Sequence, residues 1–311
     1  MNFYKKIINL IKHYLVKITK FFVPYSKIDK SQWSNPVVLE KASRFIERHR
    51  EIISDPLNQL IAKDAKSGYI EGNNVILHNG NVVPFKGSLA YYRDFSNILI
   101  LNRGVHEPLE EDCFQELLKV IDNDPIMVEL GAYWSHYSMW MLKKIPNAKC
   151  IMVEPDKNSM KCGKNNFKIN NFKGEFINKF VSDNGFNIDD FVKERNINFI
   201  DLLHSDIQGY ELEMLNGARD FLGKHGAKYL FISTHSNELH SSVLETLQSY
   251  GYIIEVSSEF EFHTTSSDGF ILASSPNSKK VFDEFNPLGR IDILNSDPNE
   301  IVKYLGNNLS E

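Results

Sequence analysis

Two apolar runs in the second half of the chain end in side chains that could move a proton. The run IDLLHSD (200–206) becomes polar at His204, and the run KYLFISTHS (228–236) carries His235 near its end. Residues 204 and 206 project on the same side of an extended strand, so His204 and Asp206 are expected to form one cluster. An ordinary histidine pKa of about 6.5 suits a general base. Asp206, His235 and His204 are therefore candidate catalytic residues, with a purely packed histidine as the alternative for His204 and His235.

Polar residues that suit a nucleoside end three earlier apolar runs. Gly131 ends the first run and would let the backbone approach a ligand closely, and Glu154 ends the second and could accept both hydroxyls of a ribose. After the third run, a polar side chain at Ser182 or Asp183 could read an adenine amino group. Each residue alone is weak evidence. The order of Glu129, Gly131, Glu154 and Asp183 along successive runs is far more specific.

The pattern that must position these residues is regular from residue 125 onward. Short apolar runs predict strands at 126–130, 150–154, 175–182, 198–206, 228–234, 252–258 and 269–274, and helical stretches separate the first six. Such alternation predicts a doubly wound, mostly parallel seven-stranded sheet in an α/β domain over residues 120–276. The last two strands are too close for a helix between them, so one should run antiparallel. Ligands of such sheets bind beyond the carboxyl ends of the strands.

The remaining segments are predicted to flank this domain. Residues 1–23 read as an amphipathic basic helix, residues 24–119 as an α+β extension, and residues 277–311 as a C-terminal tail. Inside the extension we expect helical structure over 36–65 and a hairpin turn at Asn79-Gly80. One short strand is expected within 91–104, followed by a helix from Pro108 to Ile121.

The first 23 residues separate into two faces when they are placed on a helix. One face collects apolar side chains between Tyr4 and Phe22, and the other carries five lysines and no acidic residue. The segment is too interrupted by charge to span a bilayer or to act as a secretory signal. It suits the interface of an anionic membrane, and packing on the main domain or on a second subunit is the alternative. We expect a cytoplasmic protein, held at the inner face of the membrane if this helix binds lipid.

The composition is that of a globular protein of 311 residues, with 42% hydrophobic residues and a net charge of −5. Thirty-five basic against 40 acidic residues leave no basic footprint, so no nucleic-acid partner is expected. The three cysteines form no C-x-x-C pair, which indicates a reducing compartment. The oligomeric state is left open.

The quoted motifs resemble class I S-adenosylmethionine-dependent methyltransferases, and among them the FkbM-type family. The resemblance spans about residues 98–275 and includes LNRGVHEP, VELGAYWSHYS, VEPD, IDLLHSDIQGYELEMLNGA and SSDGFILAS. Gln208, Tyr133 and Ser135 depart from the usual glutamate, asparagine and glycine. The resemblance implies that S-adenosyl-L-methionine is the cofactor and that the acceptor is a hydroxyl of a sugar or glycan-like molecule. It implies cofactor binding by Glu129, Gly131, Ala132, Tyr133, Ser135, Glu154, Pro155, Ser182, Asp183 and Asp206.

Functions other than sugar O-methylation are also compatible with parts of this pattern. A dehydrogenase would need G-x-G-x-x-G after its first strand, and Gly131 is the only glycine between residues 105 and 162. An N-methyltransferase, a methyltransferase of a non-sugar metabolite and a non-catalytic nucleoside-binding scaffold remain open. The strand-end stretch also resembles macrocin-type sugar O-methyltransferases, where Asp206, Gln208 and His235 could hold magnesium. A hard cation prefers several carboxylates and this set has one, so a metal is not favoured.

The amphipathic segment gives a first testable prediction. A protein that starts at Ser26 should lose binding to anionic vesicles, because the lysine-rich face is gone, yet keep its activity on a soluble acceptor. Vesicle co-sedimentation of the full chain and the shortened chain measures the difference. If the shortened protein instead aggregates or melts much earlier, the apolar face is a packing surface and the membrane hypothesis is wrong.

Overall fold

The computed structural model describes residues 48–50, 52–91, 96–182, 184–259, 265 and 268–309. The amphipathic helix expected over residues 1–23 and the predicted site residue Asp183 lie outside this described part. The described residues all belong to one compact unit.

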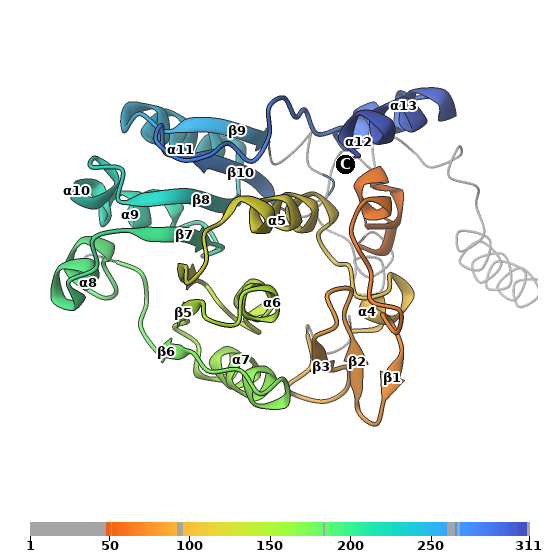
Figure 1. The fold of residues 1–311 in the computed structure, drawn as a ribbon, viewed down its shortest axis with the longest axis horizontal. Helices are drawn as coiled ribbons and strands as arrows, with labels where there is room; N and C mark the ends of the chain where they lie inside the picture. Colours follow the sequence, from red (N-terminus) through yellow and green to blue (C-terminus); the bar gives the residue numbers. More distant parts are fainter. Residues whose placement is uncertain are drawn as a thin grey trace, which may run out of the picture. The chain divides into compact units, whose positions relative to one another are not determined.

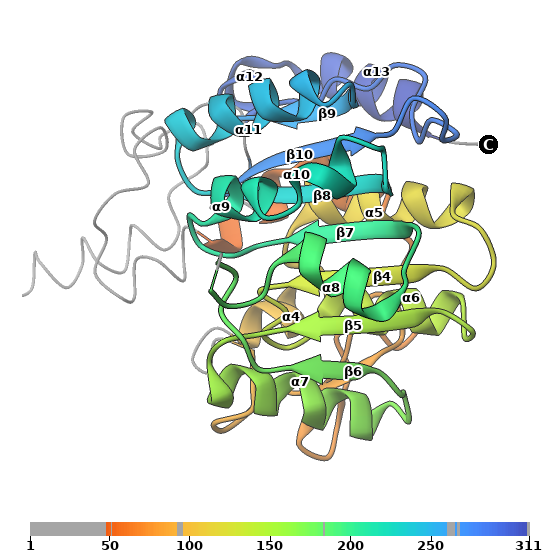
Figure 2. The same ribbon diagram turned by 90° about the vertical axis from the view of Figure 1, so that its left-hand side faces the viewer.

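A seven-stranded sheet forms the centre of this unit, in the order β6-β5-β4-β7-β8-β10-β9 (Figure 2). Its strands are β4 (Ile126–Leu130), β5 (Lys149–Val153), β6 (Glu175–Ile177), β7 (Ile200–Ser205), β8 (Ala227–Thr234), β9 (Ile253–Ser258) and β10 (Gly269–Ser274). The first five of these pair in parallel, and β10 pairs antiparallel with both β8 and β9. The predicted doubly wound, mostly parallel seven-stranded sheet is thus confirmed.

Strand order reverses between β4 and β7, which creates the switch point of the sheet. From β4 the chain proceeds outward through β5 to β6, then returns to the other side of β4 as β7. Strand β6 ends at Ile177, so the strand predicted over 175–182 is too long. Only an isolated bridge between Val181 and Phe186 follows it.

Helices follow the strands as the alternation predicted. They are α6 (His136–Lys144), α7 (Lys157–Ile169), α8 (Ile188–Arg195), α9 (Glu211–Asn216), α10 (Arg219–Leu222) and α11 (Asn237–Ser249). Side-chain caps begin three of them, with Asp156, Asn187 and Ser236 each accepting a backbone N–H from the first turn. The single helix expected over 210–222 is broken into α9 and α10 at Gly217-Ala218.

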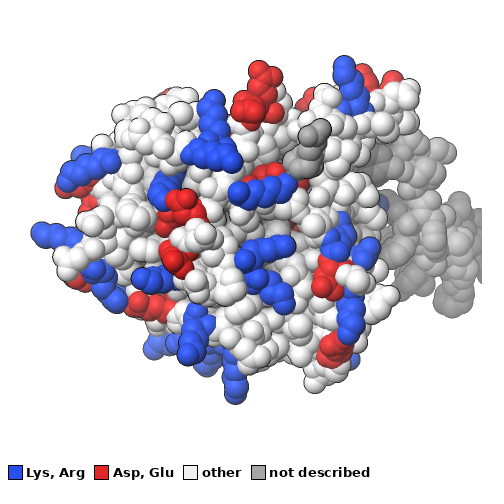
Figure 3. All heavy atoms as spheres, viewed as in Figure 1, with Lys and Arg blue, Asp and Glu red and all other residues white. Residues whose placement is uncertain are grey.

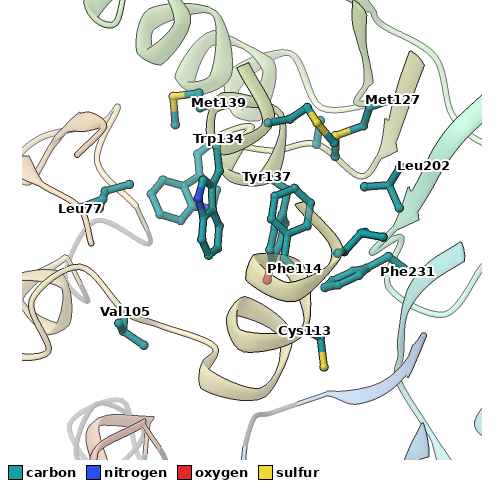
Figure 4. Close-up of a cluster of buried hydrophobic side chains, with 14 of the residues drawn as sticks. Leu77, Val105, Cys113, Phe114, Met127, Trp134, Tyr137, Met139, Leu202 and Phe231 are labelled. Atoms are coloured by element: carbon teal, nitrogen blue, oxygen red, sulfur yellow. The ribbon is translucent and has the colours of Figure 1, made fainter. Parts of the chain in front are cut away.

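Alternate residues of the strands enter two separate hydrophobic cores. On β7, Leu202 faces one core and Leu203 the other, as a period of two requires. Helices α5 (Pro108–Val120) and α6 cover the first face, and α8 and α10 lie across the sheet from them (Figure 1). Figure 4 shows Phe114, Tyr137 and Phe231 packed together in the first core.

Helix α5 packs on this sheet, although it precedes residue 120, where the α/β domain was expected to begin. Its Phe114 ring lies 5.8 Å from the ring of Phe231 on β8. The predicted helix from Pro108 is confirmed. The segment 277–311 was predicted only as a C-terminal tail. It contains the helices α12 (Arg290–Asn295) and α13 (Pro298–Asn308).

The N-terminal part contributes a small antiparallel sheet of β1 (Ile70–Glu71), β2 (Asn74–Ile76) and β3 (Val82–Pro84). The predicted hairpin is confirmed, since β2 pairs with β3 across the Asn79-Gly80 turn. Residues 36–47 and 51 of the helical structure expected over 36–65 lie outside the described part. Residues 48–50 and 52–54 are helical, and the 3-10 helix η2 (Pro56–Gln59) and irregular backbone follow them.

The strand expected within 91–104 is wrong, because Asn97–Leu101 form the helix α4. Ile98 and Leu99 are both fully buried, while Asn97 and Leu101 are exposed. Burial of adjacent residues suits one face of a short helix, whereas a strand would bury alternate ones. Short apolar runs such as this are compatible with either structure.

No helix among the described residues is both long enough and apolar enough to cross a membrane. Lysine and arginine side chains are interspersed with acidic ones on the face shown in Figure 3.

Candidate active site at the switch point of the sheet

A cleft of about 510 Å³ opens beyond the carboxyl ends of β4, β5 and β7. Five of the ten predicted cofactor-binding residues line it: Gly131, Tyr133, Glu154, Pro155 and Asp206. Six further lining residues were not among the predicted cofactor-binding residues: Ser159, Phe180, Val181, Ile207, Gln208 and Tyr210. The rule that ligands bind at the switch point therefore located the cleft but not its apolar walls.

Gly131 is required by the contact between two strand ends. Its φ is +73°, and a Cβ at this position would lie 1.7 Å from the carbonyl oxygen of Asp206. The N–H of Gly131 donates to the carbonyl of Val153 at 2.9 Å, so the end of β4 touches both of its neighbours. No side chain fits here, and the backbone is left facing the cleft.

Glu154 is held at the cleft by the backbone on either side of it. Its Oε2 accepts the N–H of Tyr133 at 3.0 Å, and its Oε1 accepts the N–H of Asp156 at 2.8 Å. Burial raises the pKa of this carboxyl above its ordinary value. Each carboxylate oxygen can accept a further hydrogen bond, so the fixed carboxylate could hold the two hydroxyls of a ribose.

Glu129, Ala132 and Ser135 support the cleft without lining it. Glu129 is buried and its Oε2 accepts the N–H of Ser138 in the first turn of α6 at 3.3 Å. Burial raises the pKa of Glu129 to about 7. Ala132 and Ser135 are buried in the turn between β4 and α6, where the Ser135 N–H donates to the Ala132 carbonyl at 2.5 Å.

Ser182 also lies outside the set of lining residues. Because β6 ends at Ile177, Ser182 sits in the following loop, where its N–H donates to the carbonyl of Phe186 at 3.2 Å. Its neighbour Val181 lines the cleft instead.

An acidic cluster surrounds His235 at the ends of β7 and β8. Its Nε2 lies 3.2 Å from Asp206 Oδ1 and 3.6 Å from Asp268 Oδ1, and its Nδ1 lies 3.0 Å from Glu211 Oε1. Gln208 Nε2 donates to Asp206 Oδ1 at 2.8 Å. Asp206 and Gln208 line the cleft, so the cluster forms one of its edges. The predicted convergence of Asp206 and His235 is present in the structure.

The ordinary histidine pKa assumed for His235 is wrong for this environment. Burial lowers its pKa, but hydrogen bonds to Asp206 and Glu211 and the charge of Asp268 outweigh burial and raise it to about 10. Burial alone would raise the pKa of Asp206, but the hydrogen bond to His235 outweighs burial, and the pKa of Asp206 is lowered. At neutral pH the pair is therefore an imidazolium and a carboxylate.

Glu211 and Asp268 were missed as members of this cluster. Glu211 is fully buried, and its Oε1 also accepts the N–H of Ile207 at 3.2 Å and of Gly209 at 3.3 Å. It lies within the quoted motif IDLLHSDIQGYELEMLNGA, close behind Asp206, and this position was the signal that the sequence offered. Asp268 precedes β10, whose first residue Gly269 pairs with Thr234. The predicted antiparallel strand could therefore have placed Asp268 beside His235.

His204 was expected to form one cluster with Asp206, but it lies outside the acidic cluster. Its ring packs 4.7 Å from the ring of Tyr137 and 5.4 Å from that of Phe231, measured between centroids. Burial lowers its pKa to about 4, so it is neutral. Within the described part of the chain neither ring nitrogen has a hydrogen-bond partner. The packing interpretation of His204 fits this environment better.

The geometry of Glu154 leads to a prediction for binding of the expected cofactor. Glu154→Ala should weaken S-adenosylmethionine binding at least ~10-fold, because a hydrogen bond to a charged acceptor is worth about 1.5–3 kcal/mol. Calorimetry measures the dissociation constant. Glu175→Ala is a matched control, since Glu175 pairs with Arg195 at 2.6 Å and does not line the cleft. An unchanged dissociation constant in Glu154→Ala would remove this residue from the binding site.

Solved structures similar to this chain include several methyltransferases. A precorrin-6y C5,15-methyltransferase from Geobacter metallireducens GS-15 is 13% identical, with a TM-score of 0.40 over 54% of this chain and 87% of its own. TrmK from M. capricolum, solved with S-adenosyl-homocysteine, is 13% identical, with a TM-score of 0.38 over 62% and 81%. A ribosomal protein L11 methylase from Lactobacillus delbrueckii subsp. bulgaricus is 10% identical, with a TM-score of 0.41 over 55% and 80%.

Sequence comparison gives one family and no individual relative. No curated protein matches the chain. Residues 183–254 match the model of the FkbM methyltransferase domain, a range that contains β7, α9, β8 and α11. This range carries Asp206, Glu211 and His235, and it joins the sheet at the switch point described above. This part of the chain is therefore similar to the FkbM methyltransferase domain.

Proposed function

We propose that the protein is an S-adenosylmethionine-dependent methyltransferase that transfers a methyl group to a hydroxyl of a sugar or glycan-like acceptor. The observation that carries this proposal is the acidic cluster of Asp206, Glu211 and Asp268 around His235 at the edge of the cleft. Carboxylates accept hydrogen bonds from hydroxyl groups, and an acceptor with several hydroxyls would use several of them. The family resemblance supports the sugar class. An acceptor attached to lipid would suit the amphipathic segment at residues 1–23.

The acidic character extends from the cluster along helix α5. Glu110 Oε2 accepts the Ser233 hydroxyl at 3.1 Å, and the Tyr137 hydroxyl lies 3.2 Å from Glu107 Oε2. Burial and the charges of Glu107, Asp268 and Asp206 raise the pKa of Glu110 well above its ordinary value. A protonated Glu110 could donate a hydrogen bond to the acceptor as well as accept one.

Gly131 and Glu154 are the residues best placed to hold the cofactor, beside the apolar walls of Phe180 and Tyr210. The cofactor supplies a methyl group on a positively charged sulfur. The chain must hold the acceptor hydroxyl within about 3–3.5 Å of that carbon and in line with it. Asp206 lines the cleft and also contacts His235, so it is the residue that joins the two binding regions.

His235 can remove the hydroxyl proton only after losing its own. In the free protein its raised pKa keeps it an imidazolium, and Asp206 is ionised beside it. Once neutral, its Nε2 faces Asp206 at the cleft and could take the proton of an acceptor hydroxyl there. Such proton transfer typically contributes 10²–10⁴-fold to the rate.

A second candidate acceptor is an amine. Asp206, Glu211 and Asp268 surround His235, and a cationic amine could pair with acidic groups of this cluster. The two candidates are separated by an acceptor panel. Calorimetry with S-adenosylmethionine and S-adenosylhomocysteine first establishes cofactor binding, and a coupled homocysteine assay then compares free sugars, glycans and amines. Turnover with sugar hydroxyls supports the proposal, and turnover with amines alone contradicts it.

The raised pKa of His235 predicts an unusual pH dependence. Because neutral imidazole forms only above the pKa, kcat/KM should rise with pH through about 10 rather than through 6.5. Asp268→Asn removes one carboxylate beside His235, so it should lower this pKa and move the midpoint to lower pH. His235→Ala should lower turnover 10²–10⁴-fold with cofactor binding intact. If the profile of Asp268→Asn coincides with that of the wild type, the general-base assignment is wrong.

Chelation tests the role of the negative charge on Asp206. Only Asp206 was predicted as a carboxylate at this site, but Glu211 and Asp268 also lie beside His235, and this makes a hard cation chemically more reasonable. Without a metal, EDTA should leave the rate unchanged, and Asp206→Asn should lower it by weakening the contact with His235. Activity that EDTA abolishes and magnesium restores would instead assign Asp206 to a metal site.

A further inference from the structure

Three histidines surround one buried carboxylate at a second location, between the N-terminal hairpin and helices α5 and α6. Glu111 Oε1 lies 3.4 Å from His78 Nε2, 3.3 Å from His136 Nε2 and 2.5 Å from His106 Nδ1. None of these four residues is more than 1% exposed. They come from separate segments of the chain, which the fold brings to one point.

The local backbone is shaped to make this meeting possible. Gly104 has a φ of +89°, and a Cβ there would lie 2.2 Å from the backbone nitrogen of His78. The loop that carries His106 can therefore press directly against the end of β2. Leu77 and Val105, on the two segments in contact, both belong to the first core (Figure 4).

Aromatic rings enclose the cluster and keep it apolar. The His136 ring stacks on Trp134 at 4.9 Å between centroids, and the His78 ring meets the edge of Trp140 at 4.4 Å. Tyr91 lies 5.1 Å from the His106 ring. A hydrophobic shell of this kind around nitrogen and oxygen ligands is a common feature of metal sites.

The ring nitrogens of His78 and His136 lack hydrogen-bond partners in the described part of the chain. All four of these nitrogens are buried, and buried polar atoms without a partner are rare. Their approaches to Glu111 are short, but they do not have the geometry of hydrogen bonds. The nitrogens and the oxygen instead approach one another as ligands of a common centre would.

The distances agree with a tetrahedral ion. Ligands held about 2.0–2.2 Å from one ion are separated from each other by roughly 3.3–3.6 Å. The contacts of Glu111 Oε1 with His78 and His136 are 3.4 and 3.3 Å, and the ligand atoms of these three residues all lie within 4.8 Å of one another. His106 Nδ1 is too close to Glu111 Oε1 to share an ion with it. The backbone N–H of His106 donates to both oxygens of this carboxylate, at 3.4 and 3.3 Å, so His106 is placed to position Glu111.

We propose that His78, Glu111 and His136 bind a divalent transition-metal ion, with His106 as a positioning residue on Glu111. Two imidazoles and one carboxylate suit zinc and its neighbours rather than magnesium or calcium. A cleft of about 690 Å³ has His78, Asn79 and Trp140 in its wall, so the proposed site lies next to it. The ion would fasten the N-terminal hairpin to α5 and α6. The site is separate from the acidic cluster and does not depend on methyl transfer.

Cobalt is a direct probe of this site in the full-length, untagged protein. After treatment with EDTA, the protein should bind one Co²⁺ per chain with the visible absorption of a tetrahedral ion, and Zn²⁺ should displace it. The double variant His78→Asn, His136→Asn should lose this absorption. His225→Asn is the control, since the ring of His225 contacts the Tyr250 carbonyl at 2.9 Å and is not in the cluster. His106→Gln should bind the ion 10–100-fold more weakly with unchanged stoichiometry.

Two measurements keep the proposal open to refutation. X-ray absorption of the zinc-loaded wild type should show two imidazole nitrogens and oxygen in the first shell, and no sulfur. Zinc should also raise the melting temperature of the wild type. Unchanged cobalt absorption in a folded double variant, or no metal binding by the wild type, would overturn the proposal. If the double variant does not fold, the first-shell composition of the wild type decides the question.

Discussion

The site depends on the backbone contact between the ends of β4 and β7. The Asp206 N–H donates to the Leu130 carbonyl at 3.0 Å, and the next residue, Gly131, is so close to the Asp206 carbonyl that no side chain could be added. This contact fixes Asp206 at the switch point. Its carboxylate faces the cleft and also contacts His235, so the position of one backbone determines how the cofactor region and the acidic cluster meet.

Periodicity predicted the sheet because its strands are short, apolar and separated by amphipathic stretches. The antiparallel β10 was predicted because the apolar runs at 252–258 and 269–274 are too close for a helix between them. Local patterns failed where tertiary contacts decide the structure. Asn97–Leu101 became a helix because Ile98 and Leu99 share one buried face, and β6 ended at Ile177 although apolar residues continue beyond it. The helices α12 and α13 lie in a polar segment whose pattern indicated only a tail.

The candidate site was predictable to the extent that strand ends reveal it. Gly131, Glu154 and Asp206 follow strands directly, and all three line the cleft. Glu211 and Asp268 approach His235 from a helix start and from a later strand, so spacing along the chain did not reveal them. The protonation state of His235 depends on that number of neighbouring carboxylates, and it therefore needs the three-dimensional arrangement.

Helix α5 connects the two charged clusters through adjacent glutamates. Glu110 accepts the Ser233 hydroxyl on β8, toward the acidic cluster, while Glu111 contacts the three histidines beside the N-terminal hairpin. Both side chains are buried, so α5 cannot rotate or slide without disturbing both sets of contacts. His106 strengthens the connection, since its Nε2 lies 3.4 Å from Glu107 while its Nδ1 contacts Glu111. The N-terminal hairpin and the acidic cluster are thus linked through the position of one helix.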